Sequence, residues 1–413
     1  MYQFRRFVTG AAFVASMFGA QEVSALTINL IDYNNTVTGT AAKQDLDIAA
    51  YYWSSLITTN ATVTIQVGYG ALGTNVIAST SSNSTSTSAA DVYLHLAATG
   101  NSALDAVAIT HLQPLDASGG LSFITNSNAG NVISKTAQVY DNDDSANNRQ
   151  LDVNTSVMKA LGYTGYNQAI DARITLSSAF AFDLNPSNGI AAGHTDFIAI
   201  AIHEMGHALG FTSGVDDYDL YAAGTKSPYT GLSVNLNASA EFSTLDLFRY
   251  SNDPGNLAPG AGPALDLSTG GTPYFSIDGT AAFNGAYFAT GKYAGDGRQA
   301  SHFKDSTGCG AQIGIMDPTF CKGQMGVVTD NDIAAIDALG WNINVDALQN
   351  FGYSVSTAQI YAQFVTPPPS GMLMAGAVPE PASWAMMLVG FGLIGAVVRQ
   401  GRRGKPLFLD SGK

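Results

Sequence analysis

The chain has 413 residues, of which only 12% are charged, and its formal net charge is −14 at pH 7. This length suffices for one large domain or two ordinary domains with a sizeable hydrophobic core. The acidic balance argues against nucleic acid or an anionic membrane surface as the partner, because both carry negative charge. Abundant Gly, Ser, Thr, Asn and Ala are more typical of an exported protein than of a cytosolic enzyme.

The N-terminal residues 1–25 have the pattern of a secretory signal peptide. Two arginines precede an apolar run at 7–20, and residues 23–25 resemble a small-residue cleavage site. The apolar run is shorter than the roughly 20 residues that a membrane-spanning helix needs. Export would place the two cysteines, Cys309 and Cys321, in an oxidising compartment, where we expect them to form a disulfide bond.

The first elements of the chain alternate between strand and helix patterns. Residues 27–33 alternate as a strand does, residues 41–56 have apolar side chains at helical spacing, and residues 62–68 again predict a strand. Strand, helix and strand in this order predict a parallel pair within a mixed sheet. Residues 79–89 are rich in Ser and Thr, and we expect a polar loop there.

Further elements surround an apolar segment at 197–211, which is predicted to be a buried helix. Helices are predicted near 91–98, 102–112, 153–162 and 330–339, and a strand at 172–178. We expect this strand to border the active-site cleft and to receive an extended peptide by strand addition. The Gly/Asn/Pro-rich residues 212–298 are interpreted as an insertion packed beside the site.

Two helices have recognisable ends. Thr195 is expected to cap the start of the apolar helix, and Gly210 to supply the left-handed residue that ends it. Thr329 and Asp332 resemble a capping box at the start of the last helix, and Gly340 is expected to end it.

Several titratable residues have no metal-binding pattern around them. His95, His111 and His194 lack a second ligand, so we interpret them as structural or surface histidines. The acidic segment 141–144 could hold calcium, but its spacing matches no EF-hand loop, which favours a solvated acidic turn. Calcium as a cofactor therefore has no support from the sequence.

The most informative motif is His203-Glu204-Met205-Gly206-His207 in the apolar helix. At 3.6 residues per turn, His203 and His207 lie on one face with Cβ atoms about 5 to 6 Å apart, so both imidazoles can reach one metal ion. Glu204 lies one position around the helix, close enough to touch a water molecule on that ion. Burying three such side chains is costly without a partner, and Zn²⁺ accounts for all of them.

Catalytic zinc usually has three protein ligands, so two histidines are not enough. The chain has the pattern His203-Glu204-x-x-His207-x-x-Gly210-x-x-Ser213. It resembles the metzincin metalloproteases up to the last position, where those enzymes have a third histidine. Serine is a poor zinc ligand, and the third ligand must therefore come from another residue.

Three sources could supply the third ligand. Asp216 and Asp217 lie just beyond the turn, and Glu241 would correspond to the thermolysin-like arrangement but lacks a convincing surrounding motif. His302 is the only histidine downstream of these residues, and it precedes a Met-containing turn at 315–318. This arrangement resembles leishmanolysin-type metzincins, in which an insertion separates the helix glycine from the third histidine.

The resemblance spans roughly 197–341 and implies an α+β, zincin/metzincin-like catalytic domain at 26–365. That domain would have a mixed twisted sheet, an active-site helix, a long insertion and a helical C-terminal subdomain. The resemblance implies His203, His207 and His302 as zinc ligands, Glu204 as catalytic base and Met316 as the hydrophobic floor under the ion. The expected activity is zinc-dependent hydrolysis of peptide bonds in protein or peptide substrates, by a zinc-activated water. The residues themselves leave Asp216 and Asp217 open as alternatives to His302.

The C-terminal part has a different organisation. Residues 366–377 form a Pro-rich linker, and Val378-Pro379-Glu380-Pro381 precedes an uncharged run at 382–398 and a basic cluster. This run is at the short end of the roughly 17 to 25 residues that span a bilayer, and the basic residues predict a cytoplasmic C-terminus. Residues 378–405 resemble the PEP-CTERM sorting signal of exopolysaccharide-forming Gram-negative bacteria. The resemblance implies export, transient anchoring in the inner membrane, cleavage by an exosortase-like enzyme, and a final place at the cell surface or in the extracellular matrix.

A second hypothesis is a non-catalytic matrix or adhesion protein that zinc merely stabilises. It predicts that Glu204→Gln changes nothing measurable. We favour the enzyme because an intact glutamate lies between the two histidines.

Overall fold

The computed structural model describes residues 26–127, 134, 136–166, 170–222, 236–238, 242–252 and 262–365. Within these residues the fold is mixed α+β, as expected. The expected signal peptide, the Pro-rich linker and the sorting signal lie outside the described residues, and so does Glu241.

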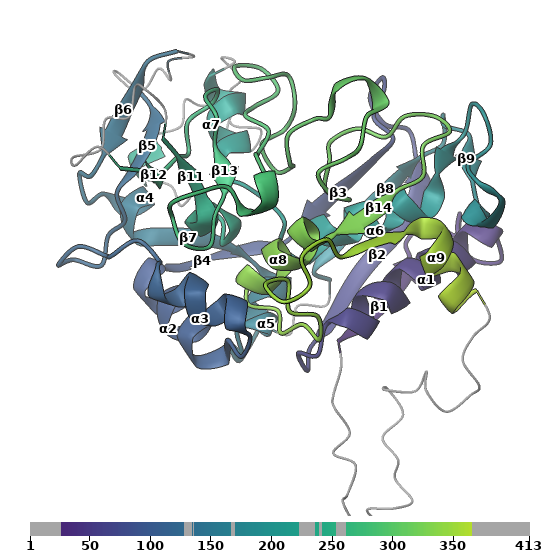
Figure 1. Ribbon diagram of the computed structural model, residues 1–413, viewed down its shortest axis with the longest axis horizontal. Helices are drawn as coiled ribbons and strands as arrows, with labels where there is room; N and C mark the ends of the chain where they lie inside the picture. Colours follow the sequence, from purple (N-terminus) through teal and green to yellow (C-terminus); the bar gives the residue numbers. More distant parts are fainter. Residues whose placement is uncertain are drawn as a thin grey trace, which may run out of the picture.

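A four-stranded sheet forms one part of the molecule (Figure 1). In spatial order its strands are β1 (Thr27–Asp32), β2 (Thr62–Gly70), β8 (Ala172–Ser177) and β3 (Ala78–Ser82). The first three strands are parallel, and β3 runs antiparallel to β8. The expected parallel pair is therefore present, and β3 is an edge strand of this sheet.

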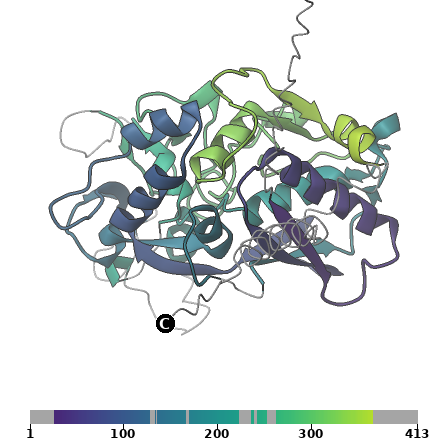
Figure 2. The same ribbon diagram turned by 90° about the horizontal axis from the view of Figure 1, so that it is seen from below.

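Two long helices pack beside each other against this sheet. Helix α1 (Ala41–Leu56) connects β1 to β2, and helix α6 (Phe197–Ala208) contacts both α1 and β3 (Figures 1 and 2). The indole Nε1 of Trp53 in α1 donates a hydrogen bond of 3.1 Å to the carbonyl of Ile202 in α6. Trp53 is fully buried. This contact fixes α6 at the centre of the fold.

The helices and strands beyond this sheet are mostly short. The other α-helices of the described residues are α2 (Ala89–Thr99), α3 (Ala103–Thr110), α4 (Ala146–Arg149), α5 (Thr155–Ala160), α7 (Val215–Ala222), α8 (Asp330–Ala338) and α9 (Thr357–Phe364). Antiparallel pairs are formed by β4 (Ser84–Ser88) with β7 (Gln150–Asn154), β5 (Phe123–Asn126) with β6 (Gln138–Asp141), and β14 (Val327–Thr329) with β15 (Ser354–Ser356). Strand β9 (Phe182–Asp183) is parallel to β10 (Thr195–Asp196), and β11 (Arg249–Ser251) lies between β12 (Ala264–Leu265) and β13 (Tyr274–Phe275).

The expectation of a polar loop at 79–89 is wrong. This segment forms most of β3, all of β4 and the start of α2. Its alternating Ser and Thr have no buried apolar face, yet hydrogen bonds to β8 and β7 hold it in strands. A strand with polar side chains on both faces is not distinguished from a loop by hydrophobic periodicity.

Two other predictions need correction. The strand at 172–178 is β8, but it lies inside the sheet between β2 and β3, so β3 takes the edge position. The helix predicted at 153–162 is shorter, because β7 continues to Asn154 before α5 begins. The same pairing with β4 that orders the Ser/Thr-rich segment extends this strand.

The helix ends follow the expected chemistry with one shift. Asp196, rather than Thr195, caps α6, and its carboxylate accepts a hydrogen bond from the Ala199 backbone N–H. Gly210 has a φ of 113° and Gly340 a φ of 102°, the left-handed conformation expected after a helix. The capping box of Thr329 and Asp332 is present at the start of α8.

Candidate metal centre

Helix α6 carries the His-Glu-x-x-His motif through the interior of the protein. Eleven of its residues are buried, and the motif side chains are the polar exceptions on an otherwise apolar helix. Three side-chain donors satisfy carbonyls at its C-terminal end. The Ser156 hydroxyl donates to Ala208 O, the Trp341 indole to Leu209 O and the Ser82 hydroxyl to His207 O. The end of the helix that carries His207 is therefore fixed by contacts from three separate segments.

Three histidines meet in front of this helix. The Nε2 atom of His207 lies 3.1 Å from Nε2 of His203 and 3.2 Å from Nε2 of His302. Nitrogen atoms of all three rings lie within 4.8 Å of one another. His302 comes from a loop 95 residues downstream of His207. The structure thus brings the three predicted ligand side chains to one point.

The second nitrogen of each ring contacts a backbone carbonyl. Nδ1 of His203 lies 2.8 Å from Ile315 O, Nδ1 of His207 lies 2.7 Å from Phe211 O, and Nδ1 of His302 lies 3.1 Å from Gln299 O. A carbonyl oxygen can only accept a hydrogen bond, so we assign the proton to Nδ1 in each ring. Each Nε2 atom then carries a lone pair, and the three atoms lie close enough together to be ligands of one metal ion.

Burial keeps these imidazoles neutral. It lowers the pKa of His203 to about 3 and that of His207 to about 4, and the charge of His207 adds to the effect on His203. Burial, followed by the charges of the other two histidines, lowers the pKa of His302 well below its usual value. At neutral pH all three rings therefore offer a lone pair, which is the form that binds a metal ion.

Glu204 lies beside the histidines and contacts the edge strand. The Thr80 hydroxyl in β3 lies 2.5 Å from Glu204 Oε2 and donates a hydrogen bond to it. Burial raises the pKa of Glu204 to about 7, while the bond from Thr80 acts in the opposite direction. A carboxyl group with a pKa near neutrality can both accept and return a proton.

Met316 lies directly against the motif helix. A Cβ atom added at Gly206 would lie 2.5 Å from the Met316 sulfur, so only a glycine permits this approach. Met316 is completely buried. The carboxylate of Asp332 accepts hydrogen bonds from the backbone N–H groups of Ile315 and Met316, which fixes the turn that also supplies the carbonyl to His203.

Ser213 does not join the histidine group. Its hydroxyl donates a 2.6 Å hydrogen bond to the buried carboxylate of Asp246, and its backbone N–H donates to the Ser301 hydroxyl at 2.9 Å. The residue that stands where a metzincin would have its third histidine therefore anchors the chain next to His302.

Asp216 serves the same loop. Its carboxylate accepts hydrogen bonds from the Ala300 N–H (2.7 Å), the Ser301 N–H (3.1 Å) and the Ser301 hydroxyl (2.5 Å). The Asp216 carboxylate is therefore occupied by the two residues that immediately precede His302 in the chain. Asp217 is exposed. Among the described residues, neither aspartate belongs to the group that could hold a metal ion.

The structure also shows where the other histidines, the acidic segment 141–144 and the two cysteines lie. His95 stacks on Tyr163, His111 is exposed and His194 is half-buried, and none of them belongs to the histidine group. Within the described residues, 141–144 form no three-ligand cluster. Cys309 and Cys321 form the expected disulfide bond.

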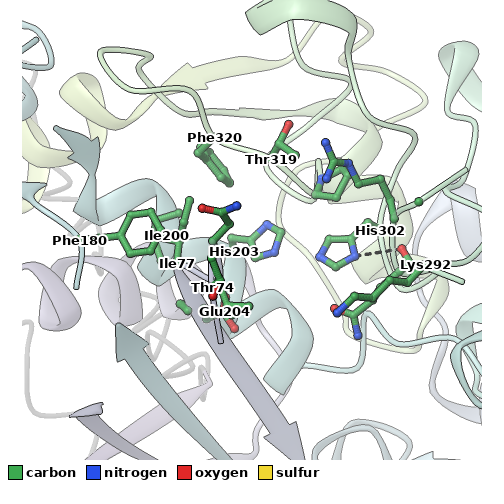
Figure 3. Close-up of a pocket in the computed structure, with 17 residues that line it drawn as sticks. Thr74, Ile77, Phe180, Ile200, His203, Glu204, Lys292, His302, Thr319 and Phe320 are labelled. Atoms are coloured by element: carbon green, nitrogen blue, oxygen red, sulfur yellow. Dashed lines mark hydrogen bonds between the residues drawn. The ribbon is translucent and has the colours of Figure 1, made fainter. Parts of the chain in front are cut away.

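A pocket of about 530 Å³ opens onto His203 and His302 (Figure 3). Its lining comes from three segments, Thr74 to Ala78, Gly297 to Gln299 and Pro318 to Phe320, together with Phe180, Ile200, His203, Glu204, Lys292 and His302.

The sequence did not predict that Thr80 and Asp332 support the site. Only the capping-box spacing pointed to Asp332, and no pattern marked Thr80 within its Ser/Thr-rich segment.

Comparison with known proteins places one segment of the chain. Residues 377–403 match the PEP-CTERM protein-sorting motif, in agreement with the signal expected at 378–405. This motif implies export, membrane-associated sorting in Gram-negative bacteria, and processing by an exosortase-like enzyme. No match was found among curated proteins. None was found among solved structures either. The resemblance of 197–341 to metzincins therefore rests on its sequence motifs alone.

No helix among the described residues is both long and apolar enough to cross a membrane. The uncharged run at 382–398, where a span was expected, lies outside the described residues.

Proposed function

We propose that this protein is an exported, zinc-dependent endopeptidase. The observation that carries the proposal is the close approach of the three Nε2 atoms of His203, His207 and His302, on a helix that also carries Glu204. Three neutral acceptors at this distance repel one another unless a cation lies between them. The carbonyl bonds to Nδ1 prevent the rings from relieving this repulsion by turning over.

The donor set fits zinc better than other common ions. Imidazole nitrogens suit Zn²⁺, whereas Mg²⁺ and Ca²⁺ prefer oxygen ligands. Three histidine ligands would leave a further coordination position free for water, as in catalytic zinc sites. His203, His207 and His302 would hold the ion, with Ile315 O, Phe211 O and Gln299 O as the groups that orient them. Bound there, the ion would activate a water molecule and polarise a substrate carbonyl.

Glu204 supports peptide hydrolysis rather than a purely structural site. Glu204 lines the pocket together with His203 and His302, which places it beside a substrate held there. The side chain would accept a proton from the attacking water and return it to the leaving amine. The Thr80 hydroxyl positions the carboxylate for both steps.

The edge of the sheet offers a place for an extended substrate. No described strand pairs with β3 on the side away from β8. The segment that leads into β3, Thr74 to Ala78, forms part of the pocket lining. A peptide that adds to this edge would extend the sheet by backbone hydrogen bonds, which suits substrates of varied sequence. The PEP-CTERM motif would deliver the enzyme through the inner membrane, and we propose the cell surface or matrix as its place of action.

Metal content and proteolysis of the full-length chain test this proposal. We expect about one zinc ion per chain and hydrolysis of casein or gelatin. Glu204→Gln should retain zinc and lose turnover, because the amide cannot accept the proton. His302→Ala should lose zinc, whereas His111→Ala, a matched change of an exposed histidine, should keep both zinc and activity.

The outcomes separate the proposal from its rival. A chain that binds zinc and is unaffected in every assay by Glu204→Gln would support the non-catalytic matrix protein. Full zinc and full activity in His302→Ala would show that the third ligand is another residue. A wild-type chain that binds no zinc would refute the peptidase.

A further inference from the structure

The pocket has two chemically different walls on either side of the catalytic group. Ile77, Phe180 and Ile200 lie on one side of His203 and Glu204 in Figure 3, with Phe320 above them, whereas Lys292 lies on the other side, next to His302. Arg298 and Gln299 line the pocket as well. One wall therefore carries the large apolar side chains of the pocket, and the other carries its basic side chains.

The basic wall is held in place by its own loop. The carboxylate of Asp219 accepts hydrogen bonds from the backbone N–H groups of Tyr293 and Ala294, at 2.9 and 2.7 Å. The N–H of Gly291 donates to Arg298 O at 2.9 Å and closes the loop. Lys292 and Arg298 therefore belong to a loop whose backbone is held by hydrogen bonds beside the pocket.

The charges on this wall are only partly neutralised. Arg298 donates from Nε to Asp305 at 2.7 Å, which leaves the two terminal nitrogens of its guanidinium for another acceptor. Among the described residues, no carboxylate lies within ion-pair distance of Lys292, which is exposed and lies 5.5 Å from the ring centre of Tyr293. Among the described residues that line the pocket, Glu204 is the only acidic one.

This local positive charge contrasts with the net charge of −14 of the whole chain. A cleft lined by one sign of charge between low-dielectric walls concentrates ligands of the opposite sign. We propose that the preferred substrates are peptides with an apolar side chain on one side of the scissile bond and an acidic side chain on the other. Lys292 and Arg298 are the specificity-determining residues for the acidic side chain, and Phe180 and Phe320 form the apolar subsite. This inference rests on the proposed peptidase function and names its substrate class.

Two mirrored series of fluorogenic peptides test the inference on the full-length chain loaded with zinc. One series has Leu before the scissile bond and Glu, Gln or Lys after it, and the other has the reverse order. In one of the two orders we expect kcat/KM to fall from Glu to Gln by about three- to tenfold and further to Lys, as expected for two partly exposed cations. Raising the salt concentration should reduce this difference.

Charge reversal identifies the residue responsible. Lys292→Glu should abolish or invert the preference for the Glu peptide over the Lys peptide, measured as the ratio of their kcat/KM values. Lys322→Glu makes the same change of charge at an exposed lysine outside the pocket lining, and should keep the wild-type preference. The same peptides are also titrated against Glu204→Gln by fluorescence anisotropy, which reports binding without turnover.

The outcomes distinguish the two proposals. If all peptides are cleaved with equal kcat/KM in both orders, or if Lys is preferred, the specificity inference fails and the peptidase stands. If no peptide is cleaved, the peptidase fails, and the anisotropy decides the inference. Tighter binding of the Glu peptide, lost in Lys292→Glu, supports an acidic ligand, and equal binding of all peptides overturns it.

Discussion

The contact between Gly206 and Met316 allows a sharp test of how the motif helix is supported. Gly206 lies in the interior of α6, where replacing glycine by alanine ordinarily stabilises a helix by roughly 0.5 to 1 kcal/mol. Here the new methyl group would lie 2.5 Å from the buried Met316 sulfur and 3.2 Å from its terminal methyl. Overpacking of this kind costs about 1 to 3 kcal/mol, so we expect Gly206→Ala to lower the free energy of unfolding by about 1 kcal/mol.

The sign of this effect should depend on Met316. Met316→Ala alone removes a fully buried side chain, which costs about 2 to 5 kcal/mol. In that background the methyl group of Gly206→Ala meets no sulfur and fills part of the cavity, so the same substitution should now stabilise by about 0.5 to 1 kcal/mol. The two changes are thus coupled by about 2 kcal/mol, a typical size for residues in contact.

Urea unfolding of the wild type, both single variants and the double variant gives this coupling energy. The measurement is made with a chelator present, so that metal binding does not add to the stability of the folded state. If Gly206→Ala changes the stability equally in both backgrounds, Met316 is not the neighbour that forbids a side chain at 206. If it stabilises the wild type, the close approach of the turn to the helix is refuted.

Three further predictions concern separate parts of the chain. Asp216→Ala should weaken zinc affinity by about 10- to 100-fold, because it releases the loop that precedes His302. Competition with a chromophoric chelator measures this affinity. Asp217→Ala is the matched control, and an equal loss of affinity in both variants would contradict the role of Asp216. Burial raises the pKa of Asp337 to about 8, so the folded state holds this proton more tightly than the unfolded state does. The contribution of this one group to the free energy of unfolding should therefore fall by about 1.4 kcal/mol per pH unit between about pH 4 and pH 8. Asp337→Asn should therefore raise the melting temperature at pH 8 and leave it unchanged near pH 4; an equal effect at both pH values would argue against a raised pKa. Replacing both Cys309 and Cys321 by Ser should cost about 3 kcal/mol in urea unfolding, since the disulfide closes a short loop, and an unchanged midpoint would speak against that constraint.

The sequence predicted those elements whose burial leaves a periodic pattern. Helix α1 has the predicted bounds, 41–56, because one face of it packs on α6 and the sheet and the other faces solvent. Strand β1 was also located within a residue of its end. Strand β3 was missed for the opposite reason, since its side chains alternate between exposed and half-buried without an apolar face. Its order comes from pairing with β8, a partner about 90 residues away that local patterns do not reveal.

In the candidate site, too, local sequence patterns predicted some residues and could not reveal others. His203, Glu204 and His207 were predictable because a helix places residues four apart on one face. His302 was named through a family resemblance, since no physical rule links a residue of α6 to a loop 95 residues later. Thr80 was not predictable, because its role depends on which edge of the sheet faces the helix. Asp332 was predicted as a helix cap, and the same carboxylate proves to hold the turn around Met316.

Ser213 shows why a departure from a motif need not be a loss. A ligand that comes from a distant segment must have its loop fixed, and the entropic cost of closing a long loop grows only slowly with its length. Local contacts can offset that cost, and here Ser213 and Asp216 bind the backbone and side chain of Ser301, next to His302. A histidine at 213 would remove the hydroxyl that binds Asp246 and crowd the loop that it now supports. In the proposed ligand set, Ser213 therefore supports the loop that carries His302 and does not itself bind the ion.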